Sequence, residues 1–333
     1  MLSRPRRNRR SPAIRALVRE ARTRPDQLVH PLFLLPGENR REGIPHLADY
    51  PRLSADEAER EIGELIGLGV RAFIAFPAVP DEHKDVRAAY GSDPDNFYLH
   101  AARRWKAARP DICLVSDVAM DPYSSDGHDG LVEGARILND ETLPILGDMA
   151  LAQAEAGFDY LGPSDMMDGR IGFLRKHLDA HGHTETGIMA YTAKYASAMY
   201  GPFRQALDSA PRADATAPAH KRSYQMDPAN RREALREMRL DVEEGADFVM
   251  VKPALHYLDV ISDLRAGSEI PVAAYHVSGE CAMLLGAIER GWLSEEAIAE
   301  TIVSLGRAGA DVIITYVARQ YAEGYRGEDP DVD

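Results

Sequence analysis

"DFVMVKPALH", residues 247–256, decides the fold, because a short apolar run ends abruptly in Lys252 and Pro253. Residues 248–251 are all apolar, and the run is too short for a typical helix. Continuous apolar runs of this length are typical of strands that are buried on both faces of a parallel sheet. The lysine therefore stands where a buried strand would end.

Seven more runs of this kind recur along the chain, and amphipathic stretches at 54–70, 141–157 and 294–310 lie between some of them. Strands that alternate with helices indicate a parallel sheet with helices on both faces. The alternative is an open doubly wound sheet, but the first run is not followed by its glycine-rich phosphate turn. Eight units predict an α/β fold, a TIM (β/α)8 barrel. The eight runs are residues 28–35, 71–77, 111–119, 158–164, 187–194, 248–253, 272–278 and 312–317.

The predicted domain organisation is an N-terminal arm at residues 1–27 and one barrel domain at residues 28–330. The first 24 residues carry nine arginines, whereas the whole chain has a net charge of -14. Two interpretations of the arm are open: a nucleic-acid contact, or an extended arm that lies on a neighbouring subunit or in solvent. The acidic bulk of the chain favours the second, because an acidic subunit attracts a basic arm.

Composition narrows the class of protein further. With 45% hydrophobic and 28% charged residues, the chain resembles an ordinary globular protein. No run approaches the roughly 18 apolar residues of a membrane helix, and no signal peptide is recognisable, so we expect a cytoplasmic protein without membrane or general nucleic-acid contacts. Cys113 and Cys281 lie far apart, which argues against a disulfide framework and against a thiolate zinc site.

Polar residues collect at the predicted strand ends, where the active site of a barrel lies. Two of them, Lys194 and Lys252, end neighbouring strands about 4.8 Å apart. One such lysine alone would most simply extend along apolar surface towards solvent. Two can share one mouth, where burial and mutual repulsion lower the pKa of an amine until it attacks a ketone as a Schiff-base nucleophile. Other predicted strand-end residues are Asp117, Ser164, Asp165, Ser278 and Tyr316.

Residues 195–247 form an unusually long connection, in which only 228–245 has a helical pattern. Long connections in compact domains are often lids, and we expect one at about residues 200–225. Arg204, Lys221 and Arg222 on it would suit the capture of a carboxylate, although a solvated surface loop is the alternative. The loop at 117–130 is rich in aspartate and would suit either a hard cation or a hydrogen-bonded turn.

Several long motifs resemble the delta-aminolevulinic acid dehydratase family, also called porphobilinogen synthases. The resemblance runs along nearly the whole chain and implies a TIM barrel whose extended arm builds a homo-octamer. It implies a lyase of haem and other tetrapyrrole biosynthesis that condenses two molecules of 5-aminolevulinate into porphobilinogen, without an organic cofactor. The motifs, in order, are "RRSPAIRALVRE", "HPLFLLPGEN", "SDVAMDPYSSDGHDG", "GPSDMMDGRIG", "AYTAKYASAMYGPFR", "YQMDPAN", "EGADFVMVKP", "YHVSGE" and "RAGADVIITY".

The resemblance also implies roles for individual residues. Lys252 would anchor the first substrate, Lys194 would engage the second, and Asp117 would assist proton transfer. Arg204 with Lys221 would clamp one substrate carboxylate, although the second clamp residue is either Lys221 or Arg222. Ser278 and Tyr316 would hold the carboxylate of the other substrate.

Metal usage is inferred from the same resemblance. Zinc-dependent members carry three cysteines in the loop after the third strand, and here those positions are Ala119, Asp121 and Asp129. Without thiolates, active-site zinc is not expected. Glu237 resembles a glutamate that holds an allosteric magnesium ion at a subunit interface, although by its pattern alone it is an exposed helix residue.

Two departures from the family pattern keep other interpretations open. Ala254 and His256 stand where the family usually has glycine and proline, and the lid is longer than usual. These changes leave room for a divergent paralogue without turnover, and a class I aldolase-like enzyme with one essential lysine is a further alternative.

Overall fold

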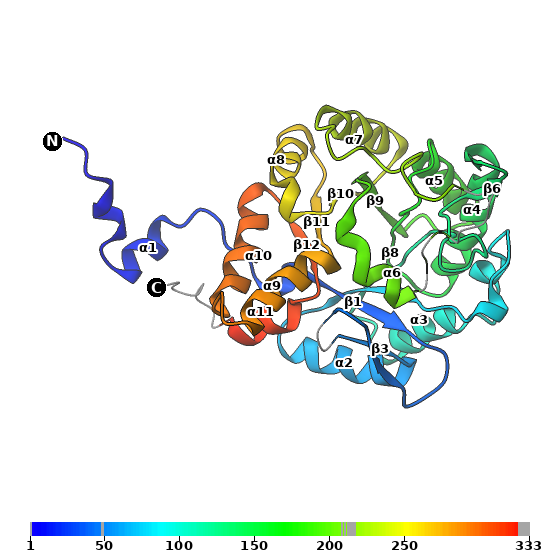
Figure 1. The fold of residues 1–333 in the computed structure, drawn as a ribbon, viewed down its shortest axis with the longest axis horizontal. Helices are drawn as coiled ribbons and strands as arrows, with labels where there is room; N and C mark the ends of the chain where they lie inside the picture. Colours follow the sequence, from blue (N-terminus) through cyan, green and yellow to red (C-terminus); the bar gives the residue numbers. More distant parts are fainter. Residues whose placement is uncertain (1, 48–49, 208, 210, 212–217, 326–333) are drawn as a thin grey trace.

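The computed structural model describes residues 2–47, 50–207, 209, 211 and 218–325, and its centre is a closed barrel of eight parallel strands (Figure 1). The sheet closes because β1 pairs with β4 on one side and with β12 on the other. The predicted TIM barrel is therefore confirmed. The barrel strands are β1 (Leu28–Leu34), β4 (Ala72–Pro77), β5 (Cys113–Val115), β8 (Tyr160–Leu161), β9 (Gly187–Lys194), β10 (Phe248–Lys252), β11 (Val272–His276) and β12 (Val312–Thr315).

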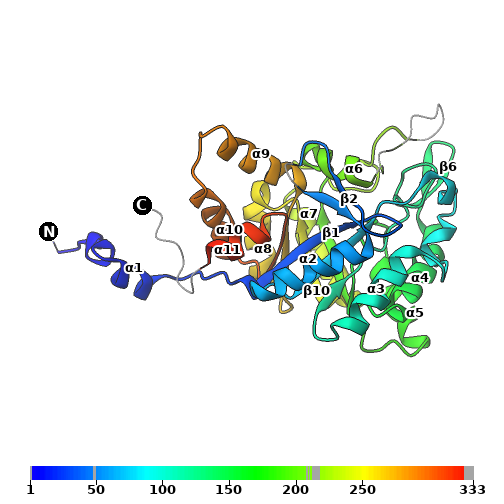
Figure 2. The same cartoon turned by 90° about the horizontal axis from the view of Figure 1, so that it is seen from below.

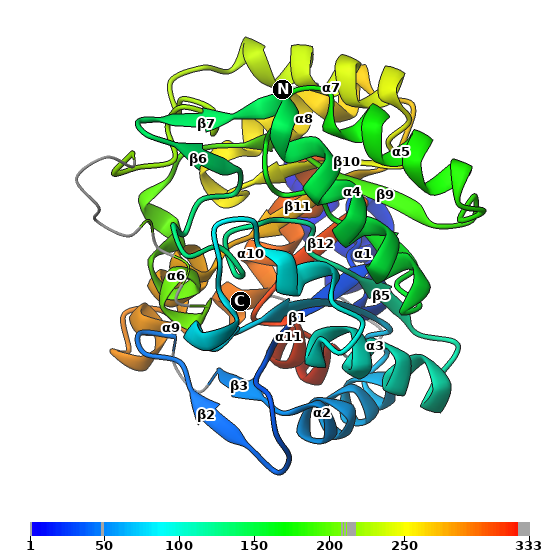
Figure 3. The same ribbon diagram turned by 90° about the vertical axis from the view of Figure 1, so that its right-hand side faces the viewer.

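Helices surround the barrel, as the view in Figure 3 shows. The three amphipathic stretches in the sequence correspond to α2, α4 and α10, with ends that agree to within a few residues. The helices of this ring are α2 (Ala55–Gly67), α3 (Phe97–Ala108), α4 (Asn139–Glu155), α5 (Arg170–Ala180), α7 (Arg232–Glu244), α8 (Leu258–Gly267), α9 (Ser278–Glu289), α10 (Glu296–Ala308) and α11 (Ala318–Gly324).

Shorter elements decorate the barrel. A hairpin of β2 and β3 extends the sheet beside β1, and β6 and β7 form a separate hairpin. The segment before β1 carries α1 and projects away from the barrel in two perpendicular views (Figures 1 and 2). These elements are β2 (Arg41–Gly43), β3 (Pro51–Leu53), β6 (Leu131–Glu133), β7 (Arg136–Leu138), α1 (Pro12–Val18), α6 (Gly201–Leu207), and the 3-10 turns η1 (Pro5–Arg9), η2 (Pro25–Gln27), η3 (Asp81–His83), η4 (Ala89–Ser92), η5 (Ala198–Tyr200) and η6 (Leu255–Tyr257).

The structure differs from the sequence-based expectation in two places. The third and fourth strands are shorter than predicted, because beyond Val115 the chains pair through isolated contacts such as Val118 with Pro163. The connection after β9 contains a helix, α6, where we expected irregular chain. Its sequence begins with Gly201 and Pro202, and proline favours the first turn of a helix.

The proposed domain limits rest on the sequence alone. The arm ends where β1 begins at Leu28, but the limit at residue 330 lies outside the described residues. The proposed lid at about 200–225 also lies partly outside them. No helix in the part of the chain that the structure describes has the length and apolarity that a bilayer crossing requires.

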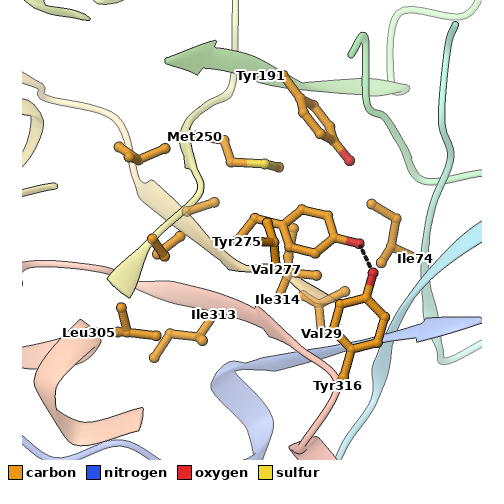
Figure 4. Packing of buried hydrophobic residues seen from close by; sticks show 14 of the residues in the cluster. Val29, Ile74, Tyr191, Met250, Tyr275, Val277, Leu305, Ile313, Ile314 and Tyr316 are labelled. Carbon is orange, nitrogen blue, oxygen red and sulfur yellow. Dashed lines mark hydrogen bonds between the residues drawn. The ribbon is translucent and has the colours of Figure 1, made fainter. Parts of the chain in front are cut away.

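Aromatic side chains fill the barrel interior near the carboxyl ends of the strands. Figure 4 shows Tyr191, Tyr275 and Tyr316 among aliphatic neighbours, with the hydroxyl groups of Tyr275 and Tyr316 joined by a 3.1 Å hydrogen bond. All three rings are buried. This aromatic layer forms the floor beneath the strand-end lysines.

Candidate active site

Lys194 and Lys252 end neighbouring strands and are direct partners in the register of β9 and β10. Both lysines are buried, with 6% and 5% of their surface exposed. They line one cavity with about 30 Å³ of free space, which holds water but not a substrate of several carbon atoms. The lining residues are Asp117, Asp121, Ser164, Lys194, Tyr200, Phe203, Arg204, Ser209, Lys221, Gln225 and Lys252.

The amine of Lys252 lies inside a cage of aromatic rings. Its Nζ lies 4.3 Å from the ring centre of Tyr275 and 4.9 Å from those of Tyr191 and Phe203. Burial, and next the charge of Lys194, lower the pKa of Lys252 to about 7, although nearby carboxylates oppose part of this change. The rings also favour the ammonium form, but desolvation outweighs them. The neutral amine is therefore much more abundant at neutral pH than in an ordinary lysine.

The amine of Lys194 has polar partners instead. Its Nζ donates a hydrogen bond to the carbonyl oxygen of Ser164 and lies 3.3 Å from Oδ1 of Asp129. Burial disfavours the Asp129 carboxylate, but the charges of Lys194 and Lys221 lower its pKa below the usual range. Asp129 is therefore ionised at neutral pH. Two lysines of one pocket thus have different environments, one apolar and one charged.

Asp117 is a buried carboxyl group in the same cavity. Burial, and next the charge of Asp121, raise the pKa of Asp117 to about 7, while a 2.6 Å hydrogen bond from Ser164 Oγ opposes this change. Gly162 allows the two loops to approach, because a Cβ at this position would lie 2.6 Å from the Ser116 carbonyl oxygen. A carboxyl group that titrates near neutral pH can both accept and donate protons.

A buried ion-pair cluster connects the segment between β9 and β10 with the loop after β5. Lys221 Nζ lies 3.0 Å from Asp121 Oδ2 and 2.7 Å from Asp129 Oδ2. Tyr224 donates a 2.8 Å hydrogen bond to Asp129, and His128 lies 3.1 Å from the same hydroxyl group. Burial favours a neutral amine, but the two carboxylates raise the pKa of Lys221, so it is charged. The aspartate-rich loop is thus a hydrogen-bonded turn that is closed by an ammonium group.

With this geometry established, comparisons with known proteins identify the family. The family model described as "Delta-aminolevulinic acid dehydratase" matches residues 2–324. The chain belongs to the delta-aminolevulinic acid dehydratase family. It is similar to the enzyme of that name from Chlamydia pneumoniae, with 48% identity over 95% of this chain and 94% of the relative. It is also similar to the chloroplastic enzyme of Chlamydomonas reinhardtii, with 47% identity over 98% of this chain and 85% of the relative.

A solved structure supports the same family. The delta-aminolevulinic acid dehydratase (porphobilinogen synthase) of Toxoplasma gondii ME49, in complex with the reaction product porphobilinogen, superimposes with a TM-score of 0.94. It shares 46% sequence identity and covers 97% of this chain and 92% of its own. The resemblance inferred from the motifs is therefore confirmed, and dehydratases of this family are lyases.

The structure brings five of the seven expected catalytic and substrate-binding residues of a dehydratase to one cavity. Lys194, Lys252, Asp117, Arg204 and Lys221 all line it. Lys221 is already paired with carboxylates, so it is not a free clamp in this closed arrangement. Arg222, the alternative, is exposed and lines neighbouring cavities instead.

The other two expected residues, Ser278 and Tyr316, are not among the described residues that line that cavity. Ser278 Oγ accepts a 3.0 Å hydrogen bond from the Phe203 backbone N–H, and Tyr316 bonds to Tyr275. Each therefore contacts a side chain or backbone of the Lys252 cage.

The altered loop after Lys252 is well supported. Ala254 has a φ of -108°, so the position does not need the conformational freedom of glycine. The buried Glu280 carboxylate accepts backbone hydrogen bonds from Leu255 at 2.8 Å and Val277 at 2.9 Å, and also from Ala254 and His256 at 3.3 Å. The substitutions that raised the possibility of a paralogue without turnover therefore fit the loop.

Glu237 lies on α7 and is half-buried, not exposed as its pattern suggested. It lines a surface cavity together with Asn139 and Asp168, whose oxygen atoms suit a hard cation. Among the residues that the structure describes, no three His, Cys, Asp or Glu side chains form a group that could hold a metal ion. A magnesium ion at Glu237 would need water or another subunit to complete its shell.

Several residues of the site were not predicted as site residues from the sequence. Tyr191, Tyr275 and Phe203 surround Lys252, and Gln225 is a buried amide whose Oε1 has no hydrogen-bond partner among the described residues. Ser164 was noted only as a strand-end residue. Alternation along β9 could not have identified Tyr191, because it lies an odd number of residues, three, before Lys194. The register shift between β9 and β10, which the sequence does not reveal, brings both side chains towards the same cavity.

Proposed function

We propose that the protein condenses two molecules of 5-aminolevulinate into porphobilinogen, with Lys252 and Lys194 as the two Schiff-base lysines. The observation that carries the proposal is the register of β9 and β10, which places both amines in one buried cavity. Membership of the dehydratase family supports the same reaction.

The two lysines divide the work according to their surroundings. Lys252 has a pKa of about 7, so its neutral amine attacks the ketone of the first substrate and releases water on forming the Schiff base. Lys194, which is paired with Asp129, must give up a proton before its amine engages the second substrate as a Schiff base. Carbon–carbon and carbon–nitrogen bond formation then returns both amines to the enzyme. Overall, two substrate molecules become one product and two molecules of water.

Asp117 and the lid residues complete the proposed site. Asp117 is close to both lysines in the same cavity and titrates near neutral pH, so it can carry protons between intermediates. Arg204 lines both this cavity and a neighbouring cationic cavity, and we propose that it binds the carboxylate of one substrate with Lys221. Ser278 and Tyr316 are proposed for the carboxylate of the other substrate.

We also propose an allosteric magnesium ion at Glu237. The oxygen donors of Glu237, Asp168 and Asn139 fit a cation that keeps several water ligands. When bound, it would supply positive charge beside α7 and the lid segment at 222–226. The test is enzyme activity with added magnesium and with a chelator, beside Glu237→Gln. Equal activity in all three conditions would contradict a magnesium site there.

Self-association through the N-terminal arm, as a homo-octamer, is a further proposal. Leu2 is 99% exposed and Leu17 is 81% exposed, so the arm presents apolar side chains without a partner in its own subunit. A groove between α9, α10 and α11 combines apolar residues with Glu295, Glu296 and Glu323, and it would suit the basic arm of a second copy. Deletion of residues 1–24 should reduce the oligomer measured by analytical ultracentrifugation.

A cytoplasmic location and the lack of a nucleic-acid partner stay predictions.

The enzyme activity is tested with a colour assay for the pyrrole product. The wild-type protein should form porphobilinogen from 5-aminolevulinate alone, and Lys252→Ala should form none. Lys176→Ala, on the outer helix α5, is the matched control and should keep full activity. Product from Lys252→Ala would contradict the proposed mechanism.

A further inference from the structure

A buried arginine lies behind the active site. Arg170 is the first residue of α5 and is 3% exposed. Its guanidinium group lies between two buried carboxylates, 3.8 Å from Asp165 and 3.7 Å from Asp241. Both distances are too long for a hydrogen bond. These carboxylates therefore balance the charge of Arg170 without fixing the direction of its donors.

The directional hydrogen bonds of Arg170 go to the backbone of the active site instead. One Nη atom donates to the Tyr191 carbonyl oxygen at 3.1 Å, and the other donates to the Met167 carbonyl oxygen at 3.3 Å. Tyr191 lies on β9, and Met167 lies in the loop that follows β8. Arg170 thus ties that loop to the strand that carries Lys194.

The loop after β8 needs such a support. Met166 has a φ of 68°, in the left-handed region that a methionine rarely adopts. Asp165 holds the turn through a 2.7 Å hydrogen bond from the Met167 N–H. Strained backbone of this kind persists only where its surroundings hold it. Arg170 contacts both ends of the strained segment through Asp165 and Met167.

Ser164, at the start of this loop, connects the support with the reacting groups. Its carbonyl oxygen accepts a hydrogen bond from Lys194, and its hydroxyl group donates to Asp117 at 2.6 Å. The ring of Tyr191, whose carbonyl oxygen Arg170 holds, lies 4.9 Å from Lys252 Nζ and 5.8 Å from Lys194 Nζ. A displaced loop would therefore move the hydrogen-bond partners of Lys194 and of Asp117, whereas the rings of Phe203 and Tyr275 beside Lys252 belong to other elements.

We propose that Arg170 is a positioning residue for the condensation, which acts through Ser164 and Tyr191 and touches no substrate itself. The proposal rests on the proposed function of the lysine pair. Lysine cannot replace Arg170, because its single ammonium group cannot reach two carbonyl oxygens in the fork geometry of a guanidinium group. The first substrate should still react at Lys252, whereas engagement of the second at Lys194 should fail.

The test compares Arg170→Lys and Arg170→Met with Arg175→Met as the matched control. Arg175 is also on α5 and donates to two backbone carbonyl groups, those of Thr186 and His183, but these precede β9 at the opposite end of the barrel. For Arg170→Lys, kcat should fall between about tenfold and a hundredfold, because a displacement of about 1 Å costs up to about a hundredfold. Its KM should stay within about threefold of the wild-type value.

Two further readouts separate positioning from folding. Borohydride reduction with 5-aminolevulinate should give undiminished adduct at Lys252 and reduced adduct at Lys194 in Arg170→Lys. Arg175→Met should keep the wild-type kcat and adduct ratio, even if urea unfolding shows it to be less stable. In the double variant Arg170→Lys with Ser164→Ala, kcat should fall by less than the product of the two single reductions. Ser164→Ala removes the hydrogen bond to Asp117, and a displaced loop in Arg170→Lys would disturb the same bond.

Several results would overturn the proposal. These are a wild-type kcat for Arg170→Lys, an equal fall in kcat for Arg175→Met, or adducts that decline equally at both lysines. Failure of both Arg170 variants to fold, while Arg175→Met folds, would assign Arg170 a structural role only. A wild-type protein that forms no porphobilinogen would instead remove the proposed function, and the proposal for Arg170 with it.

Discussion

The charge of Lys194 should control the reactivity of Lys252, and replacing Lys194 tests this. An ordinary lysine with a pKa near 10.4 is neutral in about one molecule in 2,500 at pH 7. A pKa of about 7 for Lys252 makes its neutral amine much more abundant at that pH. Burial contributes most to this change and Lys194 contributes next. Lys194→Gln removes the neighbouring charge, whereas Lys194→Arg keeps it.

The size of the effect follows from the register of the two strands. Paired positions on neighbouring strands lie about 4.8 Å apart, and we assume a separation of about 6 Å between the two amines for the Coulomb energy. At an effective dielectric constant of about 20, two charges at that distance repel by about 3 kcal/mol, or about a hundredfold in an acid dissociation constant. Asp129, whose Oδ1 lies 3.3 Å from Lys194 Nζ, keeps its own charge in both variants and so does not alter this difference. We therefore expect an increase of about two pH units in the pKa of Lys252 in Lys194→Gln.

The assay measures how fast borohydride traps 5-aminolevulinate on Lys252 at different pH values. Because the folded pKa lies below the ordinary value, trapping in the wild type should fall as the pH drops through about 7. The midpoint should lie about two pH units higher in Lys194→Gln and stay near the wild-type value in Lys194→Arg. Equal midpoints in the two variants, or a wild-type midpoint near 10, would refute the electrostatic argument.

Three other changes test separate parts of the site. Asp117→Asn should lower kcat about a hundredfold and remove one titration near pH 7 from the pH profile of kcat. An unchanged pH profile would exclude Asp117 as the proton carrier. Lys221→Met removes the only ammonium group next to the buried Asp121 carboxylate among the described ion pairs, and one of two next to Asp129, and should destabilise the protein by about 3 kcal/mol in urea unfolding. Adding Asp129→Asn should recover part of that loss; no recovery would contradict the ion-pair cluster. Glu280→Ala removes a buried acceptor of backbone hydrogen bonds from the loop after Lys252 and should cost about 3 kcal/mol; a wild-type stability would show that the loop does not depend on it.

The barrel and its two lysines could be predicted from the sequence because their signals are local. Each strand is a continuous apolar run, and the lysines follow two such runs directly. A closed parallel barrel then brings both strand ends to one mouth without further information. The same reasoning placed Asp117 correctly in the cavity.

The partners of these residues could not be predicted in the same way, because they are far apart in the sequence. Lys221 pairs with Asp121 across 100 residues, and only the folded chain shows that this ammonium group closes the aspartate-rich loop. The cage around Lys252 draws its rings from β9, β11 and α6, and α6 itself was not expected. Arg170 likewise looked like an ordinary helix residue, since its burial depends on packing against α7.

Reductive trapping followed by peptide mapping tests the central claim most directly. The wild-type protein is incubated with 5-aminolevulinate, reduced with borohydride and digested, and the modified residues are located by mass spectrometry. Adducts should form at Lys252 and at Lys194, and at no other lysine in comparable amount. Adducts spread over exposed lysines, or a product-forming enzyme without any adduct at Lys252, would contradict the shared pocket of two reactive amines.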